Sequence, residues 1–258
     1  MLEFTVMDVI DVMQTASESR QSFRDAGGQG TIVFDPTRLR QVTPAIFDPA
    51  SYGDNAQPVH GLGGRGAAWF VRGEFGNGVL RHYRRGGWMA RASESAYLWQ
   101  GEPQVRSLRE FELLNFLHGL GLPVPPAIAA YYRKHDWRYQ AAIIVERIAG
   151  VSSFIEQVNV RGAQAPWAQV GTAIGRCHRH GAHHADLNAN NILLGDLDAV
   201  WLIDWDKGRI ESSPGHWRQR VLDRLQRSLM KECKSLSGAD LAAGMQLLRA
   251  AHDRETGR

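Results

Sequence analysis

Long hydrophobic runs are missing from this 258-residue sequence. No stretch approaches the roughly 18 consecutive apolar residues that a membrane-spanning helix needs. A basic N-terminal region is missing as well, because Glu3, Asp8 and Asp11 stand where a secretory signal would carry positive charge. We therefore expect a protein that neither spans a membrane nor is exported and that stays in the cytoplasm.

Cysteine is scarce, and the two signs of charge nearly balance. Cys177 and Cys233 flank no metal-type spacing, and a protein that is not exported has little use for a disulfide, so we expect both to be packing residues. The formal net charge of +3 and the isoelectric point near 9.0 are too mild to select a partner by themselves. The hydrophobic content of 43% is sufficient for a sizeable core.

The first half of the chain is rich in expected strands. Glycine and proline punctuate residues 35–66, which favours loops there, and apolar residues recur at helical spacing over residues 107–119. Short apolar or aromatic runs bounded by turn residues predict the strands. These runs cover residues 31–34, 67–72, 78–83, 127–132 and 141–146.

The second half is mainly helical. Helices are expected over residues 167–180, 214–236 and 238–252, with short strands at 191–194 and 200–203. The change of character predicts an α+β fold of two lobes. The expected division is an N-terminal extension over residues 1–30, a β-rich N-lobe over 31–150 and a mainly helical C-lobe over 151–258.

The most constrained feature of the sequence lies around residues 183–206. Asp186 and Asn191 stand five residues apart before an expected strand, and Asp204 follows the next strand. This order offers one carboxylate as a base and an Asn/Asp pair as oxygen ligands for a hard cation. Phosphoryl transfer asks for little more from a protein. The alternative is that the residues from Asp186 to Asn191 form only an Asx-rich turn.

These residues resemble the protein-kinase-like superfamily, whose catalytic loop reads H-x-D-x-x-x-x-N and whose metal-binding carboxylate opens a D-F-G type turn. His184, Asp186 and Asn191 fill the first pattern, and Asp204 fills the second. The resemblance implies a bilobal protein-kinase-like fold, ATP and Mg²⁺, catalytic roles for Asp186 and His184, and metal ligation by Asn191 and Asp204. Trp205 departs from the D-F-G pattern and favours a small-molecule or lipopolysaccharide-type kinase.

Two further elements of a nucleotide site are expected in the N-lobe. A glycine-rich string can bring backbone amides close to phosphate oxygens, although a plain turn is the commoner meaning. Arg81 stands where the superfamily places a lysine, and Glu110 is its preferred helix partner because it shares a face with apolar residues, whereas Glu112 does not. The glycines assigned to this nucleotide site are Gly63, Gly64 and Gly66.

A closer resemblance is to the 3-deoxy-D-manno-octulosonic acid (Kdo) kinases of the lipopolysaccharide kinase family. The blocks that carry it are residues 64–70, 80–87, 109–114, 121–125 and 184–188. The resemblance implies transfer of the γ-phosphate of ATP to the 4-hydroxyl of Kdo on a lipid A precursor, at the cytoplasmic face of the bacterial inner membrane. Neither nucleic acid nor an obligate protein partner is expected.

Surface cations fit an acceptor of that kind. Arg220, Arg224 and Arg227 lie on a basic late helix that is a candidate for contact with an anionic membrane, and Arg84 and Arg85 are candidates for binding acceptor oxyanions. Solvated surface charge is the alternative for both groups.

Other functions remain open from the sequence. One is a related kinase acting on heptose or another small alcohol, and another is an inactive nucleotide-binding scaffold. The scaffold is disfavoured because His184, Asp186, Asn191 and Asp204 are all present. A zinc site at the crowded histidines is also disfavoured, since no acidic or thiol ligand completes it at a usual spacing; these histidines are His178, His180 and His183.

Overall fold

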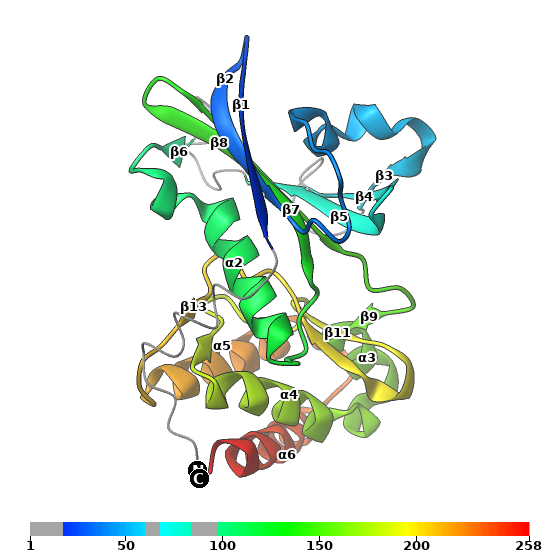
Figure 1. Ribbon diagram of the computed structural model, residues 1–258. Helices are drawn as coiled ribbons and strands as arrows, with labels where there is room; N and C mark the ends of the chain where they lie inside the picture. The colour runs from blue at the N-terminus through cyan, green and yellow to red at the C-terminus, as the bar shows by residue number, and fades with distance from the viewer. Residues whose placement is uncertain (1–17, 60–67, 84–96, 258) are drawn as a thin grey trace. The chain divides into compact units, whose positions relative to one another are not determined.

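The computed structural model of the chain describes residues 18–59, 68–83 and 97–257, which fall into two compact units (Figure 1). The first unit runs up to Phe116 and includes Pro126–Arg147. The second consists of Leu117–Pro125 and the chain from Ile148 onward. The short segment before Pro126 therefore packs with the second unit, although the sequence division had placed it in the N-lobe.

The first unit is built on an antiparallel sheet with the strand order β1-β2-β7-β8-β5-β4-β3, and β6 pairs with β8. Strand β8 lies inside this order, so its run of Ala and Ile residues is buried on both sides. Its strands are β1 (Ser19–Asp25), β2 (Gly28–Phe34), β3 (Ala56–Pro58), β4 (Ala68–Gly73), β5 (Gly76–His82), β6 (Tyr97–Leu98), β7 (Ala127–His135) and β8 (Arg138–Glu146).

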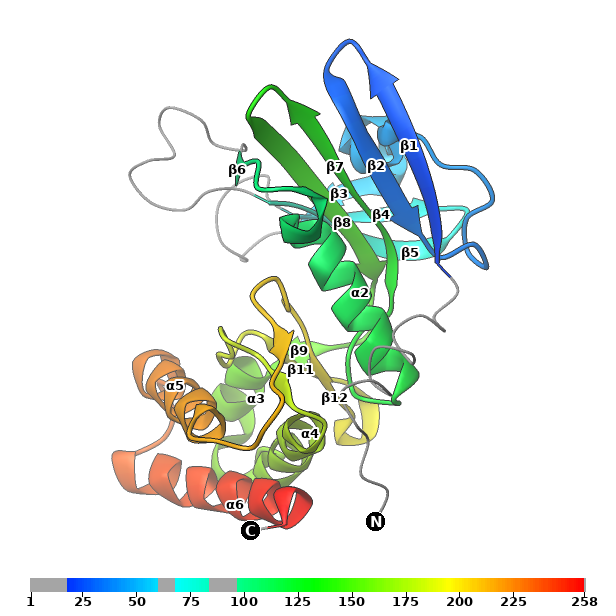
Figure 2. The same ribbon diagram turned by 60° about the vertical axis from the view of Figure 1, so that its left-hand side comes forward.

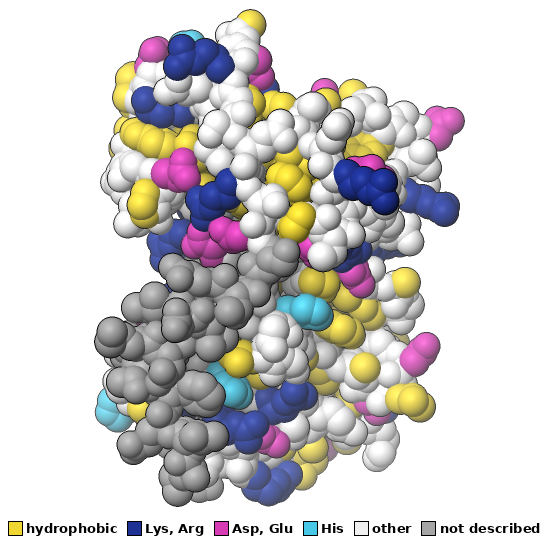
Figure 3. Space-filling view, viewed as in Figure 1, with side chains coloured by type: hydrophobic (Ala, Val, Ile, Leu, Met, Phe, Trp, Pro, Cys, Tyr) yellow, Lys and Arg dark blue, Asp and Glu magenta, His cyan; other side chains and the backbone are white. Residues whose placement is uncertain are grey.

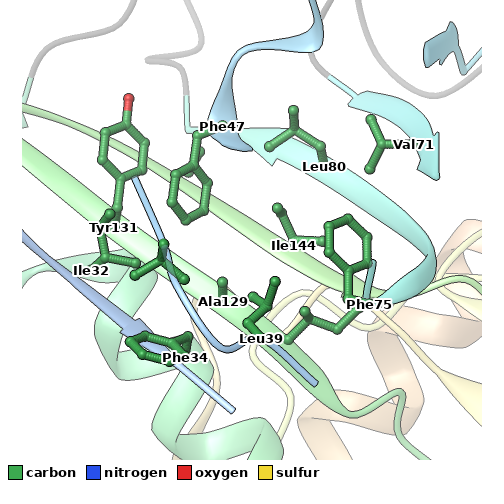
Figure 4. Packing of buried hydrophobic residues seen from close by; sticks show 13 residues of the cluster. Ile32, Phe34, Leu39, Phe47, Val71, Phe75, Leu80, Ala129, Tyr131 and Ile144 are labelled. Carbon is green, nitrogen blue, oxygen red and sulfur yellow. The ribbon is translucent and has the colours of Figure 1, made fainter. Parts of the chain in front are cut away.

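The turn-rich segment after β2 covers one face of this sheet. Two 3-10 helices, η1 (Pro44–Phe47) and η2 (Pro49–Asn55), replace the loop that the sequence predicted. Phe47 stacks on Tyr131 of β7 with ring centroids 4.3 Å apart, and Leu39 lies in the same buried cluster (Figure 4). Burying these apolar side chains is what holds a proline-rich segment against the sheet.

Helix α2 (Arg106–Gly119) belongs mostly to the first unit, with the short η4 (Glu102–Gln104) before it. The buried Ser107 hydroxyl donates to the carbonyl of Tyr131 over 2.8 Å and ties the helix to β7. Phe111 and Leu114 are buried on the same helix. This side of α2 also carries Glu110, so the carboxylate points into the unit, as its spacing predicted.

The second unit contains four α-helices and two small sheets. Gly171 and Gly175 let α4 approach α6 closely, because a Cβ on Gly171 would lie 2.1 Å from the carbonyl oxygen of Leu248 (Figure 2). The helices are α3 (Phe154–Arg161), α4 (Trp167–Arg179), α5 (Trp217–Glu232) and α6 (Gly238–Thr256), with η5 (Gly162–Gln164) and η6 (Asp196–Asp198) between them. One sheet has the order β12 (Val200–Leu202), β11 (Ile192–Leu194), β9 (Ser152–Ser153), and the other pairs β10 (Ala182–His183) with β13 (Arg209–Ile210).

Strand β1 and helix α3 are among the elements that the sequence did not predict. Strand β1 covers Ser19–Asp25, so the sheet begins inside the segment expected to be a separate extension over residues 1–30, and that boundary is corrected. Helix α3 begins at a capping box made by Ser153 and Glu156. None of the described helices combines the length and the apolar character needed to cross a membrane.

Candidate active site

The hairpin of β11 and β12 brings the two predicted metal ligands together. Ile192 pairs with Leu202, and the N–H of Ile203 donates to the carbonyl of Asn191 over 3.0 Å. Asn191 directly precedes β11 and Asp204 directly follows Ile203, so the hairpin register places both residues at the same end. The backbone hydrogen bonds of the hairpin therefore hold Asn191 and Asp204 near each other.

The loop that carries Asp186 is closed by asparagine side chains. The Asn188 Oδ1 accepts from the N–H groups of Asn190 at 2.9 Å and Asn191 at 3.2 Å. The Nδ2 atoms of Asn188 and Asn191 each donate to the Asp186 carbonyl at 3.2 Å. The Asx turn considered as the alternative is therefore present, and it is the device that sets Asp186 and Asn191 on one loop.

Helix α5 supports the same loop from outside, through residues that the sequence did not single out. The N–H of Ala189 donates to Ser228 Oγ over 3.1 Å, and Asn190 Nδ2 donates to Glu232 Oε2 over 2.7 Å. Ser228 and Glu232 are themselves joined over 3.2 Å. Their spacing of four residues along α5 is the signal that would have placed them on one helix face.

His184 is buried and bonded to backbone on both sides of its ring. The Nδ1 accepts from the N–H of Asp186 at 3.3 Å, so Nε2 carries the proton and donates to the Ile203 carbonyl at 2.9 Å. Burial lowers the pKa of His184 below its ordinary value, although the hydrogen bond to Ile203 acts in the opposite direction. A neutral ring thus links the Asp186 loop to the segment before Asp204, and the catalytic role expected of His184 stays a prediction.

The Asp186 carboxylate is held by two cations. Lys207 Nζ lies 3.2 Å from Oδ2, and Arg224 of α5 donates to Oδ1. Burial alone raises the pKa of Asp186, but the hydrogen bond from Lys207 and the charge of Arg224 outweigh it, and the pKa lies below its ordinary value. Asp186 is therefore ionised. Sequence reasoning missed both cations as partners of Asp186.

The donor set at the end of the hairpin fits a hard cation. Asn191 is buried and its Nδ2 is used by the Asp186 carbonyl, while no donor from the described ranges reaches its Oδ1. Asp204 has a positive φ of 66°, a backbone conformation that L residues rarely adopt. Amide and carboxylate oxygens are the ligands that Mg²⁺ takes from proteins.

Trp205, in the place of the superfamily's phenylalanine, acts as a packing residue. It is buried, its Nε1 donates to the Leu202 carbonyl over 3.0 Å, and its ring lies 4.6 Å from that of His184. Trp205 thus packs against His184, which belongs to the same loop as Asp186.

In the first unit, Arg81 of β5 and Glu110 of α2 form an ion pair. The Arg81 Nη2 lies 2.5 Å from Oε1 and 2.6 Å from Oε2 of Glu110, and the Tyr83 hydroxyl also donates to Oε2. The Glu110 side chain is 1% exposed. Glu112 instead pairs with Arg20 at 2.9 Å and is 37% exposed. The structure thus pairs Arg81 with the glutamate that the helix face predicted, and their role toward a nucleotide stays a prediction.

Several predicted residues lie outside the described part of the chain. These are the glycines Gly63, Gly64 and Gly66 and the arginines Arg84 and Arg85.

The histidines near the catalytic loop have other partners. His178 Nδ1 lies 2.8 Å from His252 Nε2, and His183 Nδ1 lies 2.7 Å from Glu211 Oε1. Trp217 packs against both His178 and His183. Over residues 18–59, 68–83 and 97–257, no group of three or more His, Cys, Asp and Glu side chains is arranged to hold a metal.

Comparison with known proteins decides the family. A sequence model of the lipopolysaccharide kinase (Kdo/WaaP) family matches residues 51–247. The chain belongs to this family.

Relatives within the lipopolysaccharide kinase family extend over nearly the whole chain. Over 238 residues the chain is 47% identical to a 3-deoxy-D-manno-octulosonic acid kinase of Stenotrophomonas maltophilia (strain K279a). The aligned region covers 92% of this chain and 95% of that protein. The chain is 44% identical over 243 residues to a protein of the same name from Xanthomonas oryzae pv. oryzae (strain PXO99A), with coverage of 94% and 97%. The family membership confirms the predicted kinase class and the protein-kinase-like α+β fold.

Proposed function

We propose that this protein is a Kdo kinase, which transfers the γ-phosphate of ATP to the 4-hydroxyl of the Kdo sugar on a lipid A precursor during assembly of the lipopolysaccharide core. The observation that carries the proposal is the likeness to proteins named 3-deoxy-D-manno-octulosonic acid kinase over nearly the full length of both chains. The loop geometry supports it, because Asp186 lies on the same closed loop as Asn191.

Asp186 is the proposed base. In the transfer, the acceptor oxygen bonds to the γ-phosphorus, the bond from that phosphorus to the β–γ bridging oxygen breaks, and the hydroxyl proton passes to Asp186. Asn191 and Asp204 would hold Mg²⁺, which when bound neutralises charge between the phosphates. Arg81, oriented by Glu110, is proposed to contact the nucleotide phosphates as the superfamily's lysine does.

The experiment that tests the function supplies two acceptors side by side. The protein is incubated with labelled ATP, magnesium and either a Kdo-bearing lipid A precursor or a heptosylated acceptor. Phosphate transfer to the Kdo-bearing precursor, located at the 4-hydroxyl by mass spectrometry and NMR, is the expected result. Transfer only to the heptosylated acceptor would instead favour the related kinase considered from the sequence.

We also propose that the protein works as a peripheral protein at the cytoplasmic face of the bacterial inner membrane. An exposed basic stripe on α5, made of Arg220, Arg224, Arg227 and Lys231, supports this location. The spacing of four, three and four residues keeps all of them on one helix face. In the described chain, Arg224 pairs with Asp186, whereas no carboxylate pairs with the other members of the stripe.

Elsewhere on the second unit, some basic side chains are paired with carboxylates, such as Arg161 with Asp198 and Arg179 with Glu255. On the face shown in Figure 3, Lys and Arg side chains of the second unit stand beside acidic ones. Neighbouring opposite charges cancel within a Debye length, so such a surface attracts an anionic bilayer little. The three members of the stripe that pair with no described carboxylate, Arg220, Arg227 and Lys231, keep their attraction for an anionic surface.

Charge reversal of the stripe should weaken binding to anionic vesicles. Each cation near such a surface contributes about 1 kcal/mol, so reversing Arg220, Arg227 and Lys231 to glutamate should cost at least about 3 kcal/mol, or about 100-fold in affinity. Sedimentation with phosphatidylglycerol vesicles measures this. Arg224 is left intact because it contacts Asp186.

A matched control makes the same change of net charge elsewhere. Reversal of Arg40, Arg72 and Arg109, which are exposed residues of the first unit, should reduce binding much less. Equal losses in the two triple variants would show that net charge, and not the α5 stripe, governs binding.

A further inference from the structure

Both carboxylate oxygens of the proposed base have cationic partners in this structure. Lys207 Nζ contacts Asp186 Oδ2 over 3.2 Å, and Arg224 donates to Oδ1, so each carboxylate oxygen faces a cation from a different element. An acceptor hydroxyl must form its own hydrogen bond to one of these oxygens before it can give up its proton. One of the two cations must therefore yield its place or share it.

The proposed acceptor brings a group that can draw a cation away. The relatives are named as kinases of 3-deoxy-D-manno-octulosonic acid, and an octulosonic acid carries a carboxylate on the sugar that receives the phosphate. That carboxylate would be repelled by ionised Asp186 unless a cation lies between them. The inference that follows rests on the proposed function.

Arg224 is better suited to this exchange than Lys207. Its guanidinium has a fork of donors that matches a carboxylate bidentately, and in the described chain only Asp186 is bonded to it. Its side chain is 47% exposed and that of Lys207 is 57% exposed, so both can reach solvent and the fork of donors is what distinguishes Arg224. Arg220 and Arg227 stand one turn away on the same exposed face and add positive potential for an incoming anion.

Lys207 is held more closely to the catalytic loop. It lies in the turn after Asp204, where the N–H of Gly208 donates to the Trp205 carbonyl over 2.7 Å. A single ammonium also binds a carboxylate as a point charge and without the planar match of a guanidinium. Lys207 can therefore keep Asp186 in position while Arg224 moves.

We propose that Arg224 is the residue that recognises the acceptor's carboxylate, and that it leaves Asp186 Oδ1 to do so. Binding of the acidic sugar uncovers the oxygen that takes the hydroxyl proton, while Lys207 holds the other. A neutral sugar in the same place leaves Arg224 on Asp186. Recognition of the acid and exposure of the base are then one event, which makes Arg224 a specificity-determining residue.

The test is a cycle of two acceptors and two proteins. The acceptors are the Kdo-bearing lipid A precursor dispersed in neutral detergent and the same molecule with the Kdo carboxylate methylated. For the wild type, esterification should lower kcat/KM by about 10- to 100-fold, the usual effect of losing a hydrogen bond between charged groups. Arg224→Gln should lower kcat/KM for the acid by a similar factor. For this variant, esterification of the acceptor should lower kcat/KM by less than about threefold further.

Two further variants complete the design. Arg161→Gln removes a matched exposed ion pair, in which Arg161 lies 2.6 Å from Asp198, and it should respond to both acceptors as the wild type does. In Lys207→Gln, esterification of the acceptor should lower kcat/KM by the same factor as in the wild type. The KM for ATP should be the same in Arg224→Gln as in the wild type, because Arg224 acts on the acceptor.

The outcomes separate the inference from the function on which it rests. Suppose that the wild type phosphorylates the acid and that esterification lowers kcat/KM by the same factor in Arg224→Gln as in the wild type. The substitution and the esterification then act independently, and the inference alone is overturned. If esterification no longer lowers kcat/KM in Lys207→Gln but still does so in Arg224→Gln, Lys207 is the residue that recognises the carboxylate and the inference is overturned. No transfer by the wild type to the acid contradicts the proposed function, and the inference falls with it.

Discussion

Asp186→Asn should lower kcat by on the order of 10³-fold, within the range expected for removal of a general base, while nucleotide affinity stays nearly unchanged. The asparagine keeps the shape of the side chain and one oxygen acceptor for Lys207 or Arg224, but it cannot take the acceptor's proton. Single-turnover transfer from labelled ATP measures the loss, and calorimetric titration with a non-hydrolysable ATP analogue measures binding.

The chain provides a close control for this substitution. Asp198 is also paired with an arginine, at 2.6 Å, and its side chain is 28% exposed against 31% for Asp186. Asp198→Asn removes a comparable exposed ion pair, which is worth about 0–1 kcal/mol of stability, and it should leave turnover unchanged. Turnover of Asp186→Asn within tenfold of the wild type would refute the assignment of Asp186 as the base.

The geometry of the loop that carries Asp186 was predictable because its residues are close together in sequence. His184, Asp186 and Asn191 lie within one short loop, and the two strands that follow it, β11 and β12, were recognisable as apolar runs. The position of Asp204 followed from the second of these strands. The hairpin register then brought Asn191 and Asp204 to one end, as two adjacent antiparallel strands must.

The partners of the loop were not predictable in the same way. Arg224, Ser228 and Glu232 come from α5, about forty residues farther along, and only packing of that helix brings them to the loop. In the sequence Ser228 and Glu232 appear as ordinary polar residues of an amphipathic helix, and Arg224 appeared only as a candidate for membrane contact. Their contacts depend on tertiary structure, which periodicity alone does not fix.

Strand β1 escaped prediction for a different reason. It is an edge strand with the sequence SRQSFRD, and its side chains are exposed apart from partial burial at Ser19 and Phe23. A strand of this kind is held by its backbone pairing to β2, so it needs no alternation of apolar and polar residues. Helix α3, by contrast, carried a readable signal in its capping box.

The ion pair of the first unit leads to the second large expected effect. Glu110→Ala should lower the free energy of unfolding by about 3–5 kcal/mol, because it leaves Arg81 and the Tyr83 hydroxyl without their shared carboxylate in a buried setting. Thermal denaturation followed by circular dichroism should show a Tm lower by roughly 10 °C. The KM for ATP should rise as well, since the proposed phosphate contact of Arg81 would no longer be held in place.

Glu112 on the same helix is the internal comparison. It also pairs with an arginine, Arg20 at 2.9 Å, but its side chain is 37% exposed where that of Glu110 is 1% exposed. Glu112→Ala should therefore cost no more than about 1 kcal/mol and leave the KM for ATP unchanged. If the two variants lost equal stability, burial would not be what distinguishes the pairs. If Glu110→Ala lost stability alone, with an unchanged KM for ATP, the ion pair would be structural and Arg81 would have no part in binding the nucleotide.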